Sequence, residues 1–99
     1  MTAPTDTARI LRYEVPVNDR WNLTHLPGPI VHIASRNPGT VEVWATTDSF
    51  GPYHADLRVY GTGQPYPAAS DIHHRGSTIT ADGRLVWHLM QRGPNQPSR

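Results

Sequence analysis

The sequence predicts an all-β fold, a compact antiparallel β-sandwich or small barrel of about seven short strands. Ten prolines and eight glycines interrupt the 99-residue chain every few residues, so no window keeps helical periodicity over three turns. Apolar and polar residues alternate instead over short intervals separated by turn sequences. The predicted strands are 9–17, 21–26, 30–36, 40–46, 56–60, 76–80 and 84–91.

A single β domain is predicted for residues 9–92. The polar, small residues 1–8 and the proline-rich residues 93–99 have the composition of flexible tails. At 99 residues the domain buries little apolar surface, so we expect a homo-oligomer. The Asp82-Gly83 pair predicts a tight hairpin that pairs residues 77–80 with residues 85–88.

Alternation assigns each strand an inner face. Residues Val41, Val43 and Ala45 oppose Glu42, Trp44 and Thr46, while Leu57 and Val59 oppose Arg58 and Tyr60. Residues 30–34 are mainly apolar on both faces, which is typical of a central strand covered on both sides. Four further side chains have apolar neighbours along their predicted strands and are therefore assigned to the core: Trp21, Trp87, His32 and His88.

Composition excludes several classes of function. The formal net charge is +1 without a long run of either sign, which predicts neither a nucleic-acid nor a membrane partner. The chain has no cysteine, and its apolar runs are shorter than the roughly 18 residues of a transmembrane helix. All nine basic residues are arginines, as in proteins of GC-rich genomes. A cytoplasmic location is expected, because the N-terminus lacks a signal peptide's apolar region.

Known catalytic and metal-binding patterns do not account for the remaining polar residues. His54, His73 and His74 lack the spacing of a metal site, and the serines lie outside any nucleophile elbow. The Gly61-Thr62-Gly63 run has neither the lysine of a phosphate-binding loop nor the third glycine of a dinucleotide site. We therefore expect no catalytic residue, no metal and no cofactor.

The strongest binding signal is the strand that runs into this glycine loop. Glycines permit unusual backbone angles, and Pro65 prevents the strand from resuming. Long loops are predicted over residues 47–54 and 61–75, and such loops tend to carry function. If residues 40–46 and 56–60 neighbour each other, Trp44 would join the strand and loop residues in one surface. The candidate binding residues are Trp44, Arg58, Tyr60, Gly61, Thr62, Gly63, Gln64 and Tyr66.

Five segments together resemble a family of small phage and prophage proteins of uncharacterised function. The matching segments, in order over residues 9–91, begin at Arg9, Leu26, Val41, Arg58 and Leu85. The loop of that family commonly reads Gly-Thr-Gly-His-Pro, and Gln64 replaces its histidine here. The resemblance implies a phage accessory protein that acts in the cytoplasm of a host.

Three functions remain open at this point. The leading one, favoured by the family resemblance and by the lack of a catalytic constellation, is binding of a host protein, so as to modulate host physiology or defence. The second is sequestration of a small anionic ligand such as a signalling nucleotide, by Arg58, the glycine loop and a stacking tyrosine. The third is a minor structural component of the virion.

Overall fold

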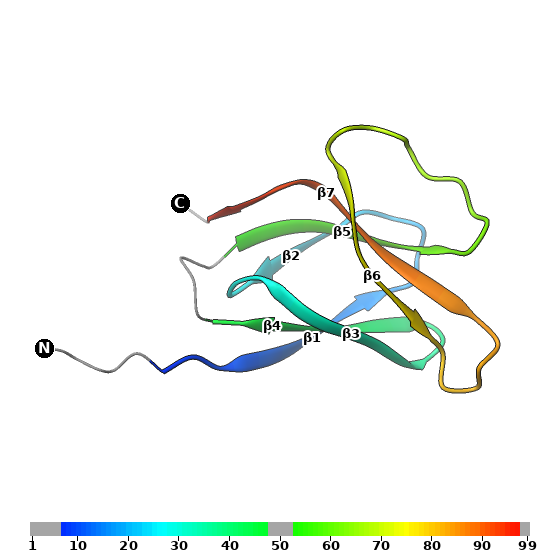
Figure 1. Ribbon diagram of the computed structural model, residues 1–99, viewed down its shortest axis with the longest axis horizontal. Helices are drawn as coiled ribbons and strands as arrows, with labels where there is room; N and C mark the ends of the chain where they lie inside the picture. Colours follow the sequence, from blue (N-terminus) through cyan, green and yellow to red (C-terminus); the bar gives the residue numbers. More distant parts are fainter. Residues whose placement is uncertain (1–6, 48–52, 98–99) are drawn as a thin grey trace, which may run out of the picture.

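A computed structural model describes residues 7–47 and 53–97, and it confirms the all-β fold. No helix among the described residues has the length and apolar character needed to cross a membrane. Seven strands follow one another along the chain (Figure 1). They are β1 (Ile10–Pro16), β2 (Asn22–Leu26), β3 (Ile30–Asn37), β4 (Thr40–Thr46), β5 (Tyr53–Gly61), β6 (Ile72–Ile79) and β7 (Val86–Pro97).

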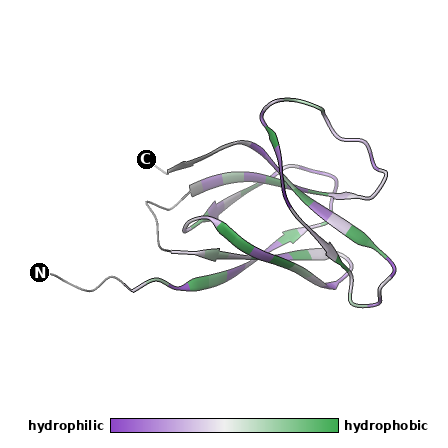
Figure 2. Cartoon of the chain, in the orientation of Figure 1, coloured by the Kyte–Doolittle hydropathy of each residue, from purple (hydrophilic) through white to green (hydrophobic). Residues whose placement is uncertain are grey.

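The strands form two antiparallel sheets that pack as a sandwich. The three-stranded sheet has the order β1-β4-β3, and the four-stranded sheet has the order β2-β5-β7-β6. Apolar and polar residues alternate along the strands, as Figure 2 shows. The inner faces meet in a core, whose fully buried members include Val15, Leu26, Val41, Val43, Leu57 and Leu89. The predicted inner faces of β4 and β5 are therefore confirmed.

The hairpin between β6 and β7 has the predicted register. Ser77 pairs with His88, and Thr78 pairs with Trp87. Gly83 has a positive φ of 75°, which the turn requires and which glycine adopts without strain. The Asp82 carboxylate accepts hydrogen bonds from the Thr80 hydroxyl at 2.6 Å and the Arg84 amide at 3.0 Å. These two bonds lower the pKa of Asp82 below its ordinary value.

The prediction that β3 is a central strand was wrong. It lies at the edge of the three-stranded sheet, where β4 is central, and Val31 is 51% exposed. The inner positions of β3 are Ile33 and Ser35, which are both buried. The edge of β3 lies beside β6, and a β-bridge joins Ser35 to Thr80, the residue after β6. A run of apolar residues thus marks a strand without showing whether both of its faces are covered.

Several strands are longer than their side-chain patterns predicted. β5 begins at Tyr53, β6 begins at Ile72 inside the predicted loop, and β7 continues to Pro97 where a flexible tail was expected. Backbone pairing explains the extensions, since Tyr53 pairs with Pro97 and Ile72 with Arg92. Ladder hydrogen bonds do not depend on side-chain polarity. The predicted loop at 47–54 lies largely outside the described residues.

Three of the four predicted core assignments also fail. Trp87 is half-buried against the core, and its indole nitrogen donates to the Pro38 carbonyl at 3.0 Å. Trp21 is half-buried on the opposite side of its sheet, beneath the guanidinium of Arg92 at 4.6 Å from the ring centre. His32 is exposed, and the half-buried His88 borders a pocket.

Candidate functional site

The outer face of the four-stranded sheet, turned away from the core, carries the candidate site. Because Leu57 and Val59 point into the core, alternation turns Arg58 and Tyr60 of β5 outward. Tyr60 is paired across the ladder with His88 of β7, which is paired in turn with Ser77 of β6. Three strands therefore bring one side chain each into a row across this face.

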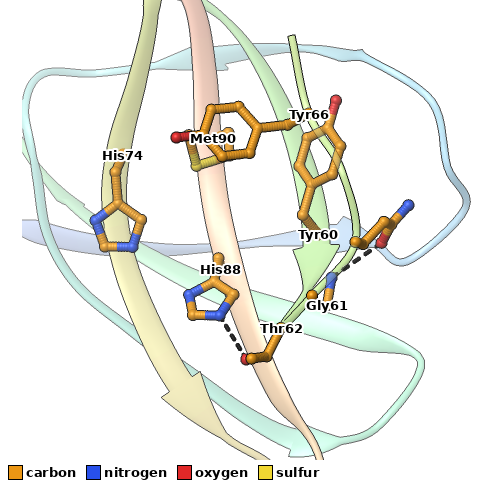
Figure 3. A pocket seen from close by; sticks show the side chains of 9 residues that line it. Tyr60, Gly61, Thr62, Tyr66, His74, His88 and Met90 are labelled. Atoms are coloured by element: carbon orange, nitrogen blue, oxygen red, sulfur yellow. Dashed lines mark hydrogen bonds between the residues drawn. The ribbon is translucent and has the colours of Figure 1, made fainter. Parts of the chain in front are cut away.

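A pocket of about 250 Å³ opens on this face where the loop between β5 and β6 begins (Figure 3). In Figure 1 this loop projects from the end of β5 before the chain returns along β6. The pocket therefore has a floor of strand residues and a wall of loop residues. It is lined by Tyr60, Gly61, Thr62, Gly63, Gln64, Tyr66, His74, His88 and Met90.

Aromatic rings form one side of the pocket. Tyr60 is buried, and its ring contacts Tyr66 edge-on with ring centres 5.9 Å apart. Tyr66 extends from the loop back across the sheet (Figure 3), and it remains 52% exposed. Arg58 lies over the Tyr60 ring at 4.7 Å, within the range of a cation–π contact. An exposed ring beside a fixed one is a suitable stacking surface for a flat ligand group.

A hydrogen-bonded chain of four side chains forms the other side. The Thr62 hydroxyl lies 2.7 Å from Nε2 of His88, and the Nδ1 atom of His88 lies 2.7 Å from the Ser77 hydroxyl. The Ser77 hydroxyl also lies 2.8 Å from Nε2 of His74. The chain joins the loop, β7 and β6, so the polar wall of the pocket depends on the order of these strands.

The glycine loop is closed on itself. The Gln64 amide donates to the Gly61 carbonyl at 3.0 Å, which makes a tight turn, and Gly63 has a positive φ of 87°. The Gln64 side chain accepts a hydrogen bond from the Gly61 amide at 3.0 Å. The backbone N–H groups of Gly61 and Gln64 are therefore already bonded. For an anion, the imidazoles of His74 and His88 are better partners than this turn.

Most of the predicted binding residues come together. Tyr60, Gly61, Thr62, Gly63, Gln64 and Tyr66 line the pocket. Arg58 lies behind Tyr60 and outside the lining, with its Nε atom buried and without a hydrogen-bond partner among the described residues. His74, His88 and Met90 also line the pocket, although they are not among the predicted binding residues. Alternation turns His88 and Met90 to one face of β7, but it does not show that β7 lies next to β5.

Trp44 does not join this surface. It lies on the outer face of the other sheet, half-buried, with its ring centre 5.3 Å from that of His32. The expectation failed because β4 and β5 belong to different sheets.

On the same outer face as Trp44, the buried carboxylate of Glu42 accepts hydrogen bonds from Arg36 and Arg12. These bonds lower the pKa of Glu42 to about 2, against an opposing effect of burial.

The histidines considered as metal ligands lie in different places. His54 contacts His25 with ring centres 4.4 Å apart, whereas His74 belongs to the chain with Ser77 and His88. His73 is exposed on β6. Over the two described ranges, no group of three metal-ligating side chains could hold an ion.

The fold and the pocket define a small β-sandwich domain with one aromatic and polar pocket on the outer face of a sheet. No curated protein and no solved structure matches the chain. Residues 6–99 match the family described as a domain of unknown function, DUF7352, and the chain belongs to that family.

Proposed function

We propose that this protein captures, without catalysis, a small ligand that carries a flat ring and an anionic group, such as a signalling nucleotide. The observation that carries the proposal is the composition of the pocket. Two tyrosines and two histidines line a volume of about 250 Å³. Tyrosine rings favour a flat group, and imidazoles favour an anion. One ligand with both features would satisfy both sides of the pocket.

The aromatic side supports stacking. Tyr60 is held by Tyr66, by Arg58 and by Trp21, whose ring centre lies 6.3 Å away. A ring that is already fixed loses little freedom when a ligand binds. Tyr60 in turn supports the exposed ring of Tyr66, and stacking of a nucleobase on that ring is worth about 1–3 kcal/mol.

The size of the pocket limits the ligand. A volume of about 250 Å³ is at the low end for small-molecule sites, which span roughly 300–1,000 Å³. It accommodates one ring and its attached anionic group, or the corresponding end of a larger molecule. A dinucleotide could place one of its halves here.

The test is native mass spectrometry of protein purified gently from a bacterial host with a GC-rich genome, with absorbance near 260 nm as a second measurement. The wild-type protein and Tyr66→Phe should carry an additional small mass. In Tyr66→Ala, which removes an exposed ring, the fraction of protein that carries this mass should fall by at least about nine-tenths. Ile79→Ala, at a position 61% exposed and outside the pocket, is the control. Equal retention by Tyr66→Ala and the control would contradict the proposal.

Binding of a host protein is the second candidate. It is favoured by the continuation of the outer face beyond the pocket, where Trp21 lies under Arg92 and Leu23 is 61% exposed. Tryptophan and arginine are enriched among residues that dominate protein interfaces. A host protein in the native mass spectrum whose binding is lost in Trp21→Ala, and not in Tyr66→Ala, would favour this function over ligand capture.

The biological setting is also part of the proposal. Resemblance of five segments to phage and prophage proteins supports a phage accessory protein that acts in the host cytoplasm. The small core of a 99-residue domain supports a homo-oligomer. Detection of the protein in purified virions would favour the alternative of a minor structural component. Its presence in infected cells and absence from virions would favour the accessory role.

A further inference from the structure

The chain of hydrogen bonds from Thr62 to His74 suggests how the pocket recognises charge. We propose that the anionic group of the ligand binds beside Thr62 and that one proton is taken up onto the His74–His88 pair as it binds. A protonated His88 must donate to Thr62, so the Thr62 hydroxyl is then free to donate to the ligand. This inference rests on the proposed function, because it concerns the same pocket.

The neutral chain can use its hydrogen atoms in a directional order. In one arrangement Thr62 donates to Nε2 of His88, His88 donates through Nδ1 to Ser77, and Ser77 donates to Nε2 of His74. All three contacts are then satisfied. In this order the Thr62 hydroxyl spends its only hydrogen on the imidazole, so it can only accept a hydrogen bond from a ligand. The reversed neutral order, with hydrogens on Nε2 of both imidazoles, frees the Thr62 hydroxyl but places no positive charge beside the anion.

One added proton reverses the first contact. If His88 takes a proton at Nε2, it donates to Thr62 and to Ser77, while Ser77 still donates to His74. Every hydrogen bond of the chain is kept. The hydrogen of Thr62, which is exposed at the mouth of the pocket, is now free for an anionic oxygen.

The surroundings favour coupling between the proton and the ligand. No residue of the described lining is acidic, so a protonated imidazole has no carboxylate there to balance its charge. The other ionisable groups nearby are Tyr60 and Tyr66 in the lining, Arg58 beside Met90, Arg75 beside His74 and Arg84, which lines a neighbouring pocket together with Thr62. Asp19 accepts a hydrogen bond from the Gln64 side chain at 3.4 Å. The carboxylate of Asp56, on the same face, binds Arg92 at 3.1 Å. An anionic ligand would supply the missing negative charge.

A second proton is disfavoured by the same geometry. The His74 and His88 ring centres are 5.8 Å apart, and two cations at that distance repel each other. Ser77 would receive two donors, and its own hydrogen would have no partner within the chain. The expected stoichiometry is therefore at most one proton for each ligand bound.

The experiment compares two probes that differ in one group. Adenosine 3′,5′-cyclic monophosphate carries a phosphodiester whose charge is constant near neutral pH, and adenosine lacks the phosphate. Calorimetry between pH 6 and pH 8, in two buffers of different ionisation enthalpy, measures affinity and the number of protons taken up. For the cyclic nucleotide we expect about 0.5 to 1 proton and an affinity that rises about threefold to tenfold per pH unit as the pH falls. Adenosine should bind more weakly and without proton uptake.

Variants separate the two parts of the inference. His88→Asn should abolish the proton uptake and the pH dependence. Thr62→Val, which removes the hydroxyl and keeps the shape, should weaken binding of the cyclic nucleotide about tenfold at pH 6 and change adenosine binding little. Thr62→Ser should restore the wild-type behaviour. His32→Asn, on the outer face of the other sheet, is the matched control and should bind as the wild type does.

Failure of this inference differs from failure of the proposed function. If both probes bind equally and neither takes up protons, the anion site is wrong while capture of a flat ring stands. If the cyclic nucleotide shows the same pH dependence in His88→Asn as in the wild type, His88 is not the proton acceptor and the inference is overturned. If neither probe binds to the wild type at millimolar concentration, the ligand class and the inference both fall.

Discussion

Glu42 shows how one buried charge is accommodated in this fold. It is only 4% exposed on the outer face of the three-stranded sheet, and its carboxylate accepts hydrogen bonds from the Nε atoms of Arg12 at 2.7 Å and Arg36 at 2.9 Å. Arg12 also binds Glu14, so the four side chains form a network. A carboxylate in such a network is stable in its charged form, because both partners are permanently cationic.

Acid should weaken the fold through this residue. The folded pKa of Glu42, about 2, lies below its ordinary value of 4.5, so its stabilising effect is present above pH 4.5 and is lost as the pH falls toward 2. Glu42→Gln should lower the thermal midpoint at pH 7, and the difference from the wild type should shrink between pH 4.5 and pH 2. Thermal denaturation followed by circular dichroism at several pH values measures this. Glu14→Gln, more exposed, is the control, and an unchanged difference at pH 2 would contradict the assignment.

At the scale of elements, the contact between β3 and β6 joins the edges of the two sheets. A Cβ atom added at Gly76 would lie 3.0 Å from Cδ1 of Ile33, which is tighter than nine in ten real Cβ contacts. The register of β6 against β7 shifts between His74 and Gly76. Glycine therefore lets the backbone of β6 approach the buried side chain of β3.

Gly76→Ala should destabilise the protein by about 1–3 kcal/mol, because it overpacks this contact. Ile33→Val removes the Cδ1 atom, so the same change should cost less in that background. Chemical denaturation of the four proteins of this double-mutant cycle measures the coupling. Gly39→Ala is the matched control, since its nearest neighbour is 3.5 Å away. Additive effects of Gly76→Ala and Ile33→Val would show that the close contact with Ile33 is not the reason that position 76 requires glycine.

At the scale of the whole molecule, each sheet has its own central strands. β4 lies between β1 and β3, while β5 and β7 lie inside the four-stranded sheet. Their inner faces supply most of the fully buried residues, including Val41, Val43, Leu57 and Leu89. The pocket is built on β5 and β7, with its loop attached at the end of β5. A rigid strand pair thus supports a more exposed loop.

Hydrogen exchange should reflect this arrangement. We expect the slowest amides in β4, in residues 55–60 of β5 and in residues 87–91 of β7, because both neighbours of these strands are present in the sheet. The amides of Tyr66 and of residues 68–70, in the exposed part of the loop, should exchange within seconds, whereas Pro65 and Pro67 have no amide hydrogen. Mass spectrometry of peptic fragments measures the pattern. Protection of β3 equal to that of β4 would favour the central position that the apolar run predicted.

The sequence by itself determined the local features of this protein. Alternation and turn residues predicted the all-β class, the inner faces of β4 and β5 and the hairpin at Asp82-Gly83, because these depend on residues close together in the chain. It also located the pocket's loop and Tyr60, since a strand that ends in glycines and proline is a local signal. The lengths of β6 and β7 were underestimated, because backbone pairing has no side-chain signature.

Only the tertiary structure decided which strands are neighbours. It placed β3 at an edge, put Trp44 on the other sheet from Arg58, and set β7 between β5 and β6. The last arrangement brought His74, His88 and Met90 to the pocket. Pairing of distant strands follows from how the two sheets jointly bury their apolar faces, and alternation within one strand does not specify its partner. The aromatic half of the site could therefore be predicted, and its histidine half required the fold.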